Sequence, residues 1–345
     1  MNKSYFELLP RDYFDGLYEK VMKDLKKGDN VCVSAIYGTG NRTFLNLFFR
    51  FAEEDKIFDK IVYFDPQRNL DNLASFVKGV KTKNRFQKIL VVIRLFEKIS
   101  NKRDVLEKLN SLRQPEPERL TFLVLADHTV VTEPENYLAE TATFFNSHIY
   151  IRPFNKKESI AMMEITNNFF GWKVNENLYD EIYELSGGIG RLLKYICKET
   201  SEGKLDFKRP EVFLEIPQIN FQVEYLTRIL FNYNNETLKK LGLLNEEEKI
   251  RSKLLYLYAK YYRPVLIKEL FPTLSNLEQQ VLGLLYELKG KCVSIDQIGD
   301  IFERLDREFS PWAIYKLISR LKPKVKNNFE ILSIKGKGYY LRSVS

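Results

Sequence analysis

Five short apolar runs, separated by stretches long enough to form helices, constrain this fold more than any other feature of the sequence. The runs are VCVSAI, KIVYFDP, FQKILVVIRLF, LTFLVLAD and HIYIRP. Strands that alternate with helical stretches predict a parallel sheet with crossover helices. After Pro153 the spacing of apolar residues turns helical, and no strong strand follows until the C-terminus. We therefore expect an α/β domain followed by helical segments.

The stretch from Val31 to Phe49, VCVSAIYGTGNRTFLNLFF, reads as a strand, a turn that contains glycine, and a helix. A phosphate-binding P-loop has this context. Its backbone N–H groups converge on phosphate oxygens, its lysine neutralises charge, and its Ser or Thr holds magnesium. Gly38 and Gly40 fall where such a turn needs glycine. In that register, however, Asn41 replaces the lysine, so the loop departs from the motif.

Neither register of this loop keeps the whole motif. With Asn41 at the lysine position, Arg42 replaces the Ser or Thr. A shift by one residue puts Arg42 at the lysine and Thr43 at the hydroxyl, but Ile36 and Asn41 then stand at the two glycine positions. Arginine is planar and bulky, and it does not routinely replace a lysine that acts as a point charge.

The acids that ATP hydrolysis needs are also missing from the third apolar run. Magnesium-dependent hydrolysis requires an acidic side chain at the end of an apolar strand. Arg94 and Leu95 stand at that place, and Glu97 follows one turn too late. We therefore predict no catalytic residues and no metal ligands. The two histidines, with no paired Cys motif, also argue against a zinc site.

A glycine-rich segment further along the chain, ELSGGIGRLLKYI, places Arg191 at the start of a helix. It resembles the sensor-2 region of AAA+ and STAND-type ATPases, in which an arginine reaches the nucleotide phosphates. Together with YGTG, the five strands and the helical stretch after RPFNKKES, it makes residues 1–205 resemble a divergent member of that class. Origin-recognition-type ATPases are the nearest comparison in arrangement. The resemblance implies a P-loop NTPase-like parallel sheet with a helical lid.

Two interpretations of this first part of the chain stay open. In one, a degenerate nucleotide-binding site is built from Gly38, Gly40, Asn41, Arg42, Thr43 and Arg191. In the other, the glycines merely make a tight turn from strand to helix, and Arg191 is solvated or caps its helix. Without the loop lysine and the acids, we predict no resident cofactor. Weak binding of ATP or ADP through backbone amides stays open.

Residues 273–345 carry a second resemblance. Two helices are predicted in TLSNLEQQVLGLLYELKGKCVSIDQIGDIFERL, with KCVS leading into the second. A third helix is predicted in SPWAIYKLISRLKPKV, where Ser310 is an N-cap candidate and Pro311 takes the first helical position. A hairpin is predicted in ILSIKGKGYYL. The unit resembles the winged-helix DNA-binding domain of OmpR/PhoB-type response regulators, although Trp312 and Ala313 replace the usual Arg-Thr pair of that family. The stripe expected to be buried in the first helix is Leu277, Val281, Leu284, Leu285 and Leu288.

The resemblance and the charge pattern together predict a face that binds DNA. From Ser310 to the end there are eight Lys or Arg against one acid, Glu330, whereas the whole chain has a net charge of +8. Such a surplus on one small unit indicates a polyanionic partner. The third helix has an inward apolar stripe from Ile314 to Leu321, and its other face carries donors and an aromatic ring, which suit base edges and phosphates. The predicted DNA contacts are Trp312, Lys316, Ser319, Arg320, Lys322, Lys324, Lys335 and Lys337.

The 345 residues are enough for several domains. We predict a degenerate P-loop NTPase-like α/β core at 1–153, a helical lid at 154–205, a helical linker at 206–268 and a winged helix at 269–345. Three cysteines far apart in sequence fit a reduced, cytoplasmic protein better than a disulfide framework. No apolar run reaches the ~18 residues of a membrane span, and the N-terminus has no signal-peptide core.

The sequence is compatible with three functions. The first is a DNA-binding transcription regulator whose AAA-like body serves regulation or assembly and is not an enzyme. The alternative is an active AAA+ ATPase in replication initiation or transposition, using Arg42 and Thr43 in an unusual loop. The third is a protein-interaction scaffold with no DNA affinity. The expected partners are double-stranded DNA and, through the AAA-like domain, another copy of the chain or another protein; no membrane is expected.

Overall fold

The computed structural model describes residues 5–67, 72–83, 87–137, 144–203, 207–305 and 307–344. The chain divides into two compact units, Met1–Lys208 and Arg209–Ser345, and each unit has its own sheet. No helix in the described ranges is long and apolar enough to span a membrane. The predicted boundary between lid and linker, at 205 and 206, lies outside the described residues.

A parallel sheet organises the first unit, with the strand order β2-β3-β4-β1-β5. Its strands are β1 (Val31–Ala35), β2 (Lys60–Phe64), β3 (Ile89–Ile93), β4 (Leu120–Ala126) and β5 (Ser147–Ile151). Every pairing between them is parallel. The five apolar runs therefore form the predicted α/β sheet, and this prediction is confirmed. β1, β3 and β4 are buried along their whole length, because helices cover both faces of a parallel sheet.

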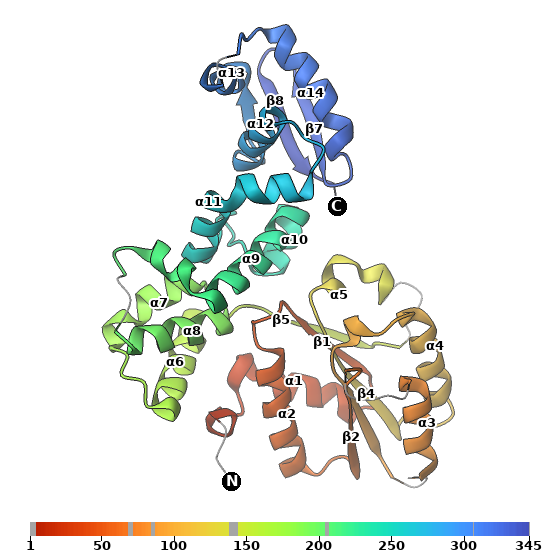
Figure 1. Ribbon diagram of the computed structural model, residues 1–345. Helices are drawn as coiled ribbons and strands as arrows, with labels where there is room; N and C mark the ends of the chain where they lie inside the picture. The colour runs from red at the N-terminus through yellow and green to blue at the C-terminus, as the bar shows by residue number, and fades with distance from the viewer. Residues whose placement is uncertain are drawn as a thin grey trace. The chain divides into compact units, whose positions relative to one another are not determined.

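Helices cover the two faces of this sheet. Before β1 come η1 (Tyr5–Leu8) and α1 (Tyr13–Lys26). The connections between strands contain α2 (Asn41–Asp55), α3 (Leu73–Lys83) and α4 (Lys102–Arg113), with the shorter η2 (Phe96–Lys98), α5 (Thr129–Thr132) and η3 (Pro134–Asn136). Figure 1 shows α1 and α2 on one side of the sheet and α3 and α4 on the other. Val77 of α3 and Leu106 of α4 belong to the same buried core as Val91 and Phe122 of the sheet.

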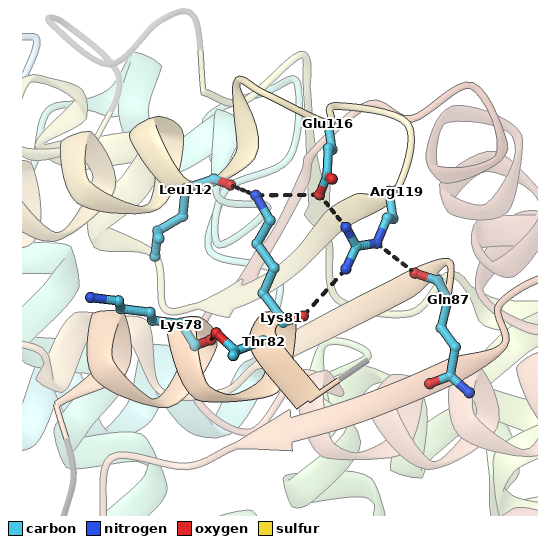
Figure 2. Close-up of polar contacts among 7 residues, drawn as sticks. All are labelled: Lys78, Lys81, Thr82, Gln87, Leu112, Glu116 and Arg119. Carbon is cyan, nitrogen blue, oxygen red and sulfur yellow. Dashed lines mark hydrogen bonds and ion pairs between the residues drawn. The ribbon is translucent and has the colours of Figure 1, made fainter. Parts of the chain in front are cut away.

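A polar cluster joins α3 and α4 to the loop before β4 (Figure 2). The ammonium group of Lys81 donates to the carbonyl of Leu112 over 2.8 Å and lies 3.4 Å from the Glu116 carboxylate. Arg119 pairs with the same carboxylate and donates to the carbonyls of Lys81 and Gln87. The cluster therefore holds α3 and α4 at the amino ends of β3 and β4.

The helices predicted after β5 are α6 (Lys156–Phe170), α7 (Tyr179–Ser186) and α8 (Gly190–Ser201), with η4 (Glu176–Leu178) between the first two. Asn155 caps α6 in a capping box with Glu158, which satisfies backbone N–H groups at both positions. The start of α8 is tied to the turn that follows β1, because the N–H of Arg191 donates to the carbonyl of Gly38 over 2.9 Å. This contact brings the predicted sensor-2 segment to the predicted phosphate loop.

The second unit begins with helices and ends in a small antiparallel sheet. Its helical elements are η5 (Pro210–Glu215), α9 (Pro217–Asn232), α10 (Asn235–Lys240), α11 (Lys253–Leu270), α12 (Asn276–Glu287), α13 (Ile295–Arg304) and α14 (Pro311–Val325). Its strands are β6 (Cys292–Ser294), β7 (Phe329–Ile334) and β8 (Gly338–Ser343), in the order β6-β8-β7. The helical region and the C-terminal segment thus belong to one compact unit, and the finer four-part division stays a prediction.

Two details of the C-terminal segment differ from the sequence-based expectation. The KCVS segment, expected only to lead into a helix, contains the edge strand β6, which pairs with β8. In the predicted apolar stripe, Leu284 and Leu288 are only partly buried, whereas Leu282 is fully buried instead. α12 contacts α11, α13 and β8, and a helix packed on several sides buries positions that a single stripe does not contain.

Candidate functional sites

The turn between β1 and α2 requires its glycines. Gly38 and Gly40 have φ values of 97° and 137°, a region that side chains with a Cβ rarely adopt. A Cβ on Gly40 would also lie 2.7 Å from the ring of Phe14. Thr39 closes the turn, because its N–H and its hydroxyl both donate to the carbonyl of Ile36. The backbone is therefore as tight as both interpretations of the sequence expect.

Asn41, which the first register predicts at the lysine position, is partly buried and contacts the end of β4. Its Nδ2 donates to the carbonyl of Ala126, at the end of β4, over 2.7 Å. Its Oδ1 is buried and has no hydrogen-bond partner among the described residues. Thr43, which supplies the hydroxyl in the shifted register, is also buried. Asn41 therefore joins the start of α2 to β4 and supplies no positive charge for a ligand.

A cavity of about 430 Å³ lies beside this turn, and its volume falls in the range of small-molecule sites, about 300–1,000 Å³. All the predicted nucleotide-binding residues line it: Gly38, Gly40, Asn41, Arg42, Thr43 and Arg191. Arg94 and Lys194 add two further cationic side chains. No Asp or Glu of the described residues lines the cavity, so its side-chain charge is entirely positive and suits an anion.

Arg191 and Lys194 lie three residues apart on α8 and both line the cavity. The guanidinium of Arg191 lies 4.0 Å from the centre of the Tyr37 ring, a cation–π distance. Burial lowers the pKa of Lys194 below its ordinary value, and the nearby charge of Arg42 lowers it further. Lys194 was not among the residues predicted from the sequence, although its spacing from Arg191 places both on one helix face.

Arg94 lies directly after β3, where the sequence lacks the expected acid. Its Nη1 lies 3.4 Å from Oδ2 of Asp65, a carboxylate at the end of β2 whose side chain is only 2% exposed. The other oxygen of Asp65 accepts a hydrogen bond from the N–H of Gln67 over 3.0 Å. Asp65 does not line the cavity. Asp65 was not predicted as a site residue, although it directly follows the apolar part of a predicted strand.

Two other acids, Glu97 and Asp127, lie near the carboxyl ends of β3 and β4. Leu95 has a φ of 53°, so the chain turns sharply after β3 and enters η2. Burial raises the pKa of Glu97, and the negative charge of Asp127, just after β4, raises it further. Asp127 accepts hydrogen bonds from the N–H and the hydroxyl of Thr129. Neither acid lines the cavity.

Magnesium is the metal that the resemblance to P-loop ATPases implies, and the lining residues do not fit it. Proteins usually bind Mg²⁺ through one or two carboxylates together with substrate phosphates. In the described part of the chain, this cavity presents cationic side chains and no carboxylate. The same described ranges contain no group of three or more His, Cys, Asp or Glu that could hold a metal ion.

In the second unit, α14 has the start that its sequence predicts. The hydroxyl of Ser310 accepts a hydrogen bond from the N–H of Ala313 over 3.1 Å, and Pro311 occupies the first helical position. The predicted apolar stripe, from Ile314 to Leu321, is buried. The helix is therefore fixed at its start and along one side, and its opposite side faces solvent.

That opposite side of α14 presents two aromatic rings to solvent. The side chains of Trp312 and Tyr315 are 66% and 62% exposed, and their ring centres lie 5.9 Å apart. Large apolar groups this exposed and this close together are typical of a contact surface. Trp312 was predicted from the sequence and Tyr315 was not, although a spacing of three residues places both on one face.

Cationic side chains surround these rings and continue into the hairpin. Lys316 and Arg320 on α14, and Lys335 and Lys337 in the turn between β7 and β8, are all exposed. Their charged groups have no hydrogen-bond or ion-pair partner among the described residues. Ser319 is exposed beside Arg320, and Lys322 is partly exposed at the next turn. The unit therefore offers several uncompensated positive charges at one helix face and one turn.

Lys324 differs from the other predicted DNA contacts. Its ammonium group lies 2.8 Å from both carboxylate oxygens of Glu278 and donates to the carbonyl of Thr273. Burial alone would raise the pKa of Glu278, but hydrogen bonds from Lys324 and Ser275 outweigh burial and lower it. Lys324 thus holds α14 against α12, and its role at a DNA surface stays a prediction.

Comparisons with known proteins give no family for this chain. No family model and no curated protein matches it. Among solved structures, RuvB of Thermotoga maritima, a Holliday junction branch migration motor, is 12% identical, with a TM-score of 0.46 over 75% of this chain and 99% of that chain. ORC1 of Aeropyrum pernix, in complex with DNA, is 13% identical, with a TM-score of 0.38 over 97% and 89%. Domain III of the Thermotoga maritima replication initiation protein DnaA is 11% identical, with a TM-score of 0.44 over 60% and 97%. The α/β assignment rests on the strand order and helices of the chain itself.

Proposed function

We propose that this protein binds double-stranded DNA through α14 and the β7–β8 turn, and that its AAA-like body acts in a process on DNA such as replication initiation or transposition. The observation that carries the proposal is the exposed face of α14, which combines Trp312 and Tyr315 with Lys316 and Arg320. The order of α12, β6, α13, α14, β7 and β8 along the chain supports the winged-helix arrangement that the sequence resembles.

The chemistry of this face suits a DNA groove. An α-helix fits the major groove, where arginine and lysine donate to guanine and where apolar groups contact the thymine methyl. Lys316 and Arg320 lie one turn apart on α14, so they can follow the groove together. Lys335 and Lys337 extend the positive surface at the hairpin turn, where phosphates of the neighbouring backbone would bind them.

The first unit bears on the choice between the two DNA-related functions that the sequence suggests. No feature of the described residues favours transcription over another process on DNA. The cavity beside Gly38, by contrast, is cationic and large enough for a ligand. A body used only as a support needs no such cavity, so we favour replication initiation or transposition over transcription regulation, without the ATP hydrolysis that the alternative interpretation assumes. Self-assembly through this body and a cytoplasmic location remain predictions.

Hydrolysis of ATP is a second candidate function. The observation in its favour is the presence of Asp65, Glu97 and Asp127 near the carboxyl ends of the strands. None of these carboxylates lines the cavity in the described chain, so one of them would have to change position before it could hold a metal or a water. We therefore place DNA binding first.

The fluorescence of Trp312 tests the DNA-binding proposal directly. The chain has two tryptophans, so Trp172→Phe leaves Trp312 as the sole emitter. Because Trp312 is 66% exposed, duplex DNA that covers α14 should move its emission to shorter wavelength and quench it. The measurement is a titration of the full chain with duplex DNA at low salt, where phosphate contacts are strongest.

The reciprocal variant, Trp312→Phe, is the matched control. Its remaining tryptophan, Trp172, belongs to the first unit and stacks on Phe170, so its emission should not change in the same titration. If the emission of Trp312 stays constant while DNA binding saturates, α14 is not the contact surface and the proposal fails.

A further inference from the structure

The cavity beside the β1–α2 turn gathers positive charge from three separate elements. Arg42 comes from the first turn of α2, Arg94 from the end of β3, and Arg191 and Lys194 from α8. Like charges held close together at a partly buried site repel one another. Burial lowers the pKa of Lys194, and the charge of Arg42 lowers it further. An anion in the cavity would remove this cost.

The distribution of these charges differs from that of a working P-loop. There, one loop lysine and one magnesium ion neutralise the phosphates. Here Asn41 replaces the lysine and donates to Ala126. Arg94 stands where the acid that holds magnesium is expected, and Asp65 balances part of its charge without lining the cavity. Positive side chains thus occupy the regions where the lysine and the metal would act.

We propose that the cavity binds the polyphosphate of a nucleotide without a divalent metal. Lys194 and Arg42 supply the charge of the missing lysine, and Arg94 supplies charge in place of magnesium. Magnesium that coordinates the phosphates neutralises the charge that these side chains attract, so it should compete with binding and not assist it. The inference goes beyond DNA binding and does not depend on it.

The remaining lining favours a nucleotide over a simple phosphate chain. Tyr37, Phe6 and Tyr195 contribute aromatic side chains, and Phe154 and Met162 add apolar surface. Aromatic side chains stack on nucleobases, and small-molecule sites typically combine such apolar walls with a few convergent polar groups. A nucleotide would use both parts of the lining, whereas tripolyphosphate would use only the cationic part.

Calorimetry with the full chain tests this inference. ATP, ADP and tripolyphosphate are titrated once in EDTA and once in excess magnesium, at the same ionic strength. We expect ATP to bind in EDTA at least as tightly as in magnesium, and tripolyphosphate to bind more weakly than ATP. A loss of affinity of about tenfold or more when magnesium is removed would overturn the inference, as would the absence of ATP binding at millimolar concentrations.

Variants assign the binding to the cavity. Lys194→Met and Arg42→Gln should each weaken ATP binding in EDTA by about tenfold, because each removes a charge-assisted contact with phosphate. Lys198→Met is the matched control, since Lys198 lies one turn further on α8, pairs with Glu199 and Glu202, and does not line the cavity. Equal affinity for ATP in EDTA of the wild type and all three variants would contradict the inference. Arg42 is exposed, so Arg42→Gln should fold and can test the cavity even if Lys194→Met does not fold. In each variant, retained binding of duplex DNA shows separately that the second unit is folded.

Discussion

Asn41, which the first register predicts at the position of a P-loop lysine, uses its amide to donate to the carbonyl of Ala126. Arg94, predicted to stand in place of a magnesium-binding acid, has its Nη1 3.4 Å from Oδ2 of Asp65. Phosphoryl transfer is accelerated mainly by positive groups and metal ions held at the developing charge. These substitutions could be recognised from the sequence, since they depend only on residue identity at fixed positions. The contacts of Asn41 and Arg94 could not, because they depend on strands far apart in the chain.

At this scale we predict no magnesium-dependent ATP turnover above background, with or without duplex DNA. Loss of a single stabilising donor typically costs about 100–1,000-fold in kcat, and here both the lysine and the acid are replaced. The measurement is phosphate release at saturating ATP, magnesium and DNA. Turnover that Arg42→Ala abolishes would mean that the shifted register, with Arg42 and Thr43, is catalytic and that this prediction is wrong.

Among the elements, the strands of the first sheet were predictable because each run is apolar along its length, as β1, β3 and β4 require when both faces are covered. β6 was not predictable, because it is only three residues long and its pairing with β8 depends on tertiary contact. The cavity was only partly predictable. Its walls from α2 and α8 contain the predicted residues. The spacing of Lys194 from Arg191 places both on one helix face, but the contact of α8 with the turn at Gly38 is what brings that face to the cavity.

The pairing of β6 with β8 leads to a prediction about Gly338. This residue has a φ of 147°, and a Cβ there would lie 1.9 Å from the carbonyl oxygen of Val293. Gly338→Ala should therefore destabilise the second unit by about 2–4 kcal/mol, because the backbone of β6 would have to move. The measurement is thermal unfolding followed by Trp312 emission in the Trp172→Phe background.

Gly336→Ala provides the comparison for this prediction. Gly336 also has a positive φ, 71°, but nothing lies within 4 Å of a Cβ at that position. Only the left-handed backbone conformation is then penalised, by about 1–2 kcal/mol. Similar losses of stability in the two variants would show that β6 can move away from Gly338 at little cost, against this prediction.

At the scale of the whole molecule, the two units carry different kinds of positive site. The first unit has cationic side chains around a cavity, and the second has them on an exposed helix face and a hairpin turn. Nearly all of the net charge of +8 comes from the segment that begins at Ser310, where eight Lys or Arg stand against one acid. A long-range attraction to DNA should therefore depend mainly on the second unit.

The salt dependence of duplex DNA binding by the full chain tests most directly whether α14 and the β7–β8 turn contact DNA. Each phosphate contact contributes about 0.9 to the slope of log affinity against log salt. Lys337→Ala should therefore lower the slope by about 1 and weaken binding to all sequences alike, whereas Arg320→Ala should cost about 1–3 kcal/mol and relax sequence preference. Lys268→Ala, an exposed lysine on α11, should leave both unchanged. If the wild type and all three variants bind with the same affinity and slope, α14 and the β7–β8 turn do not read DNA.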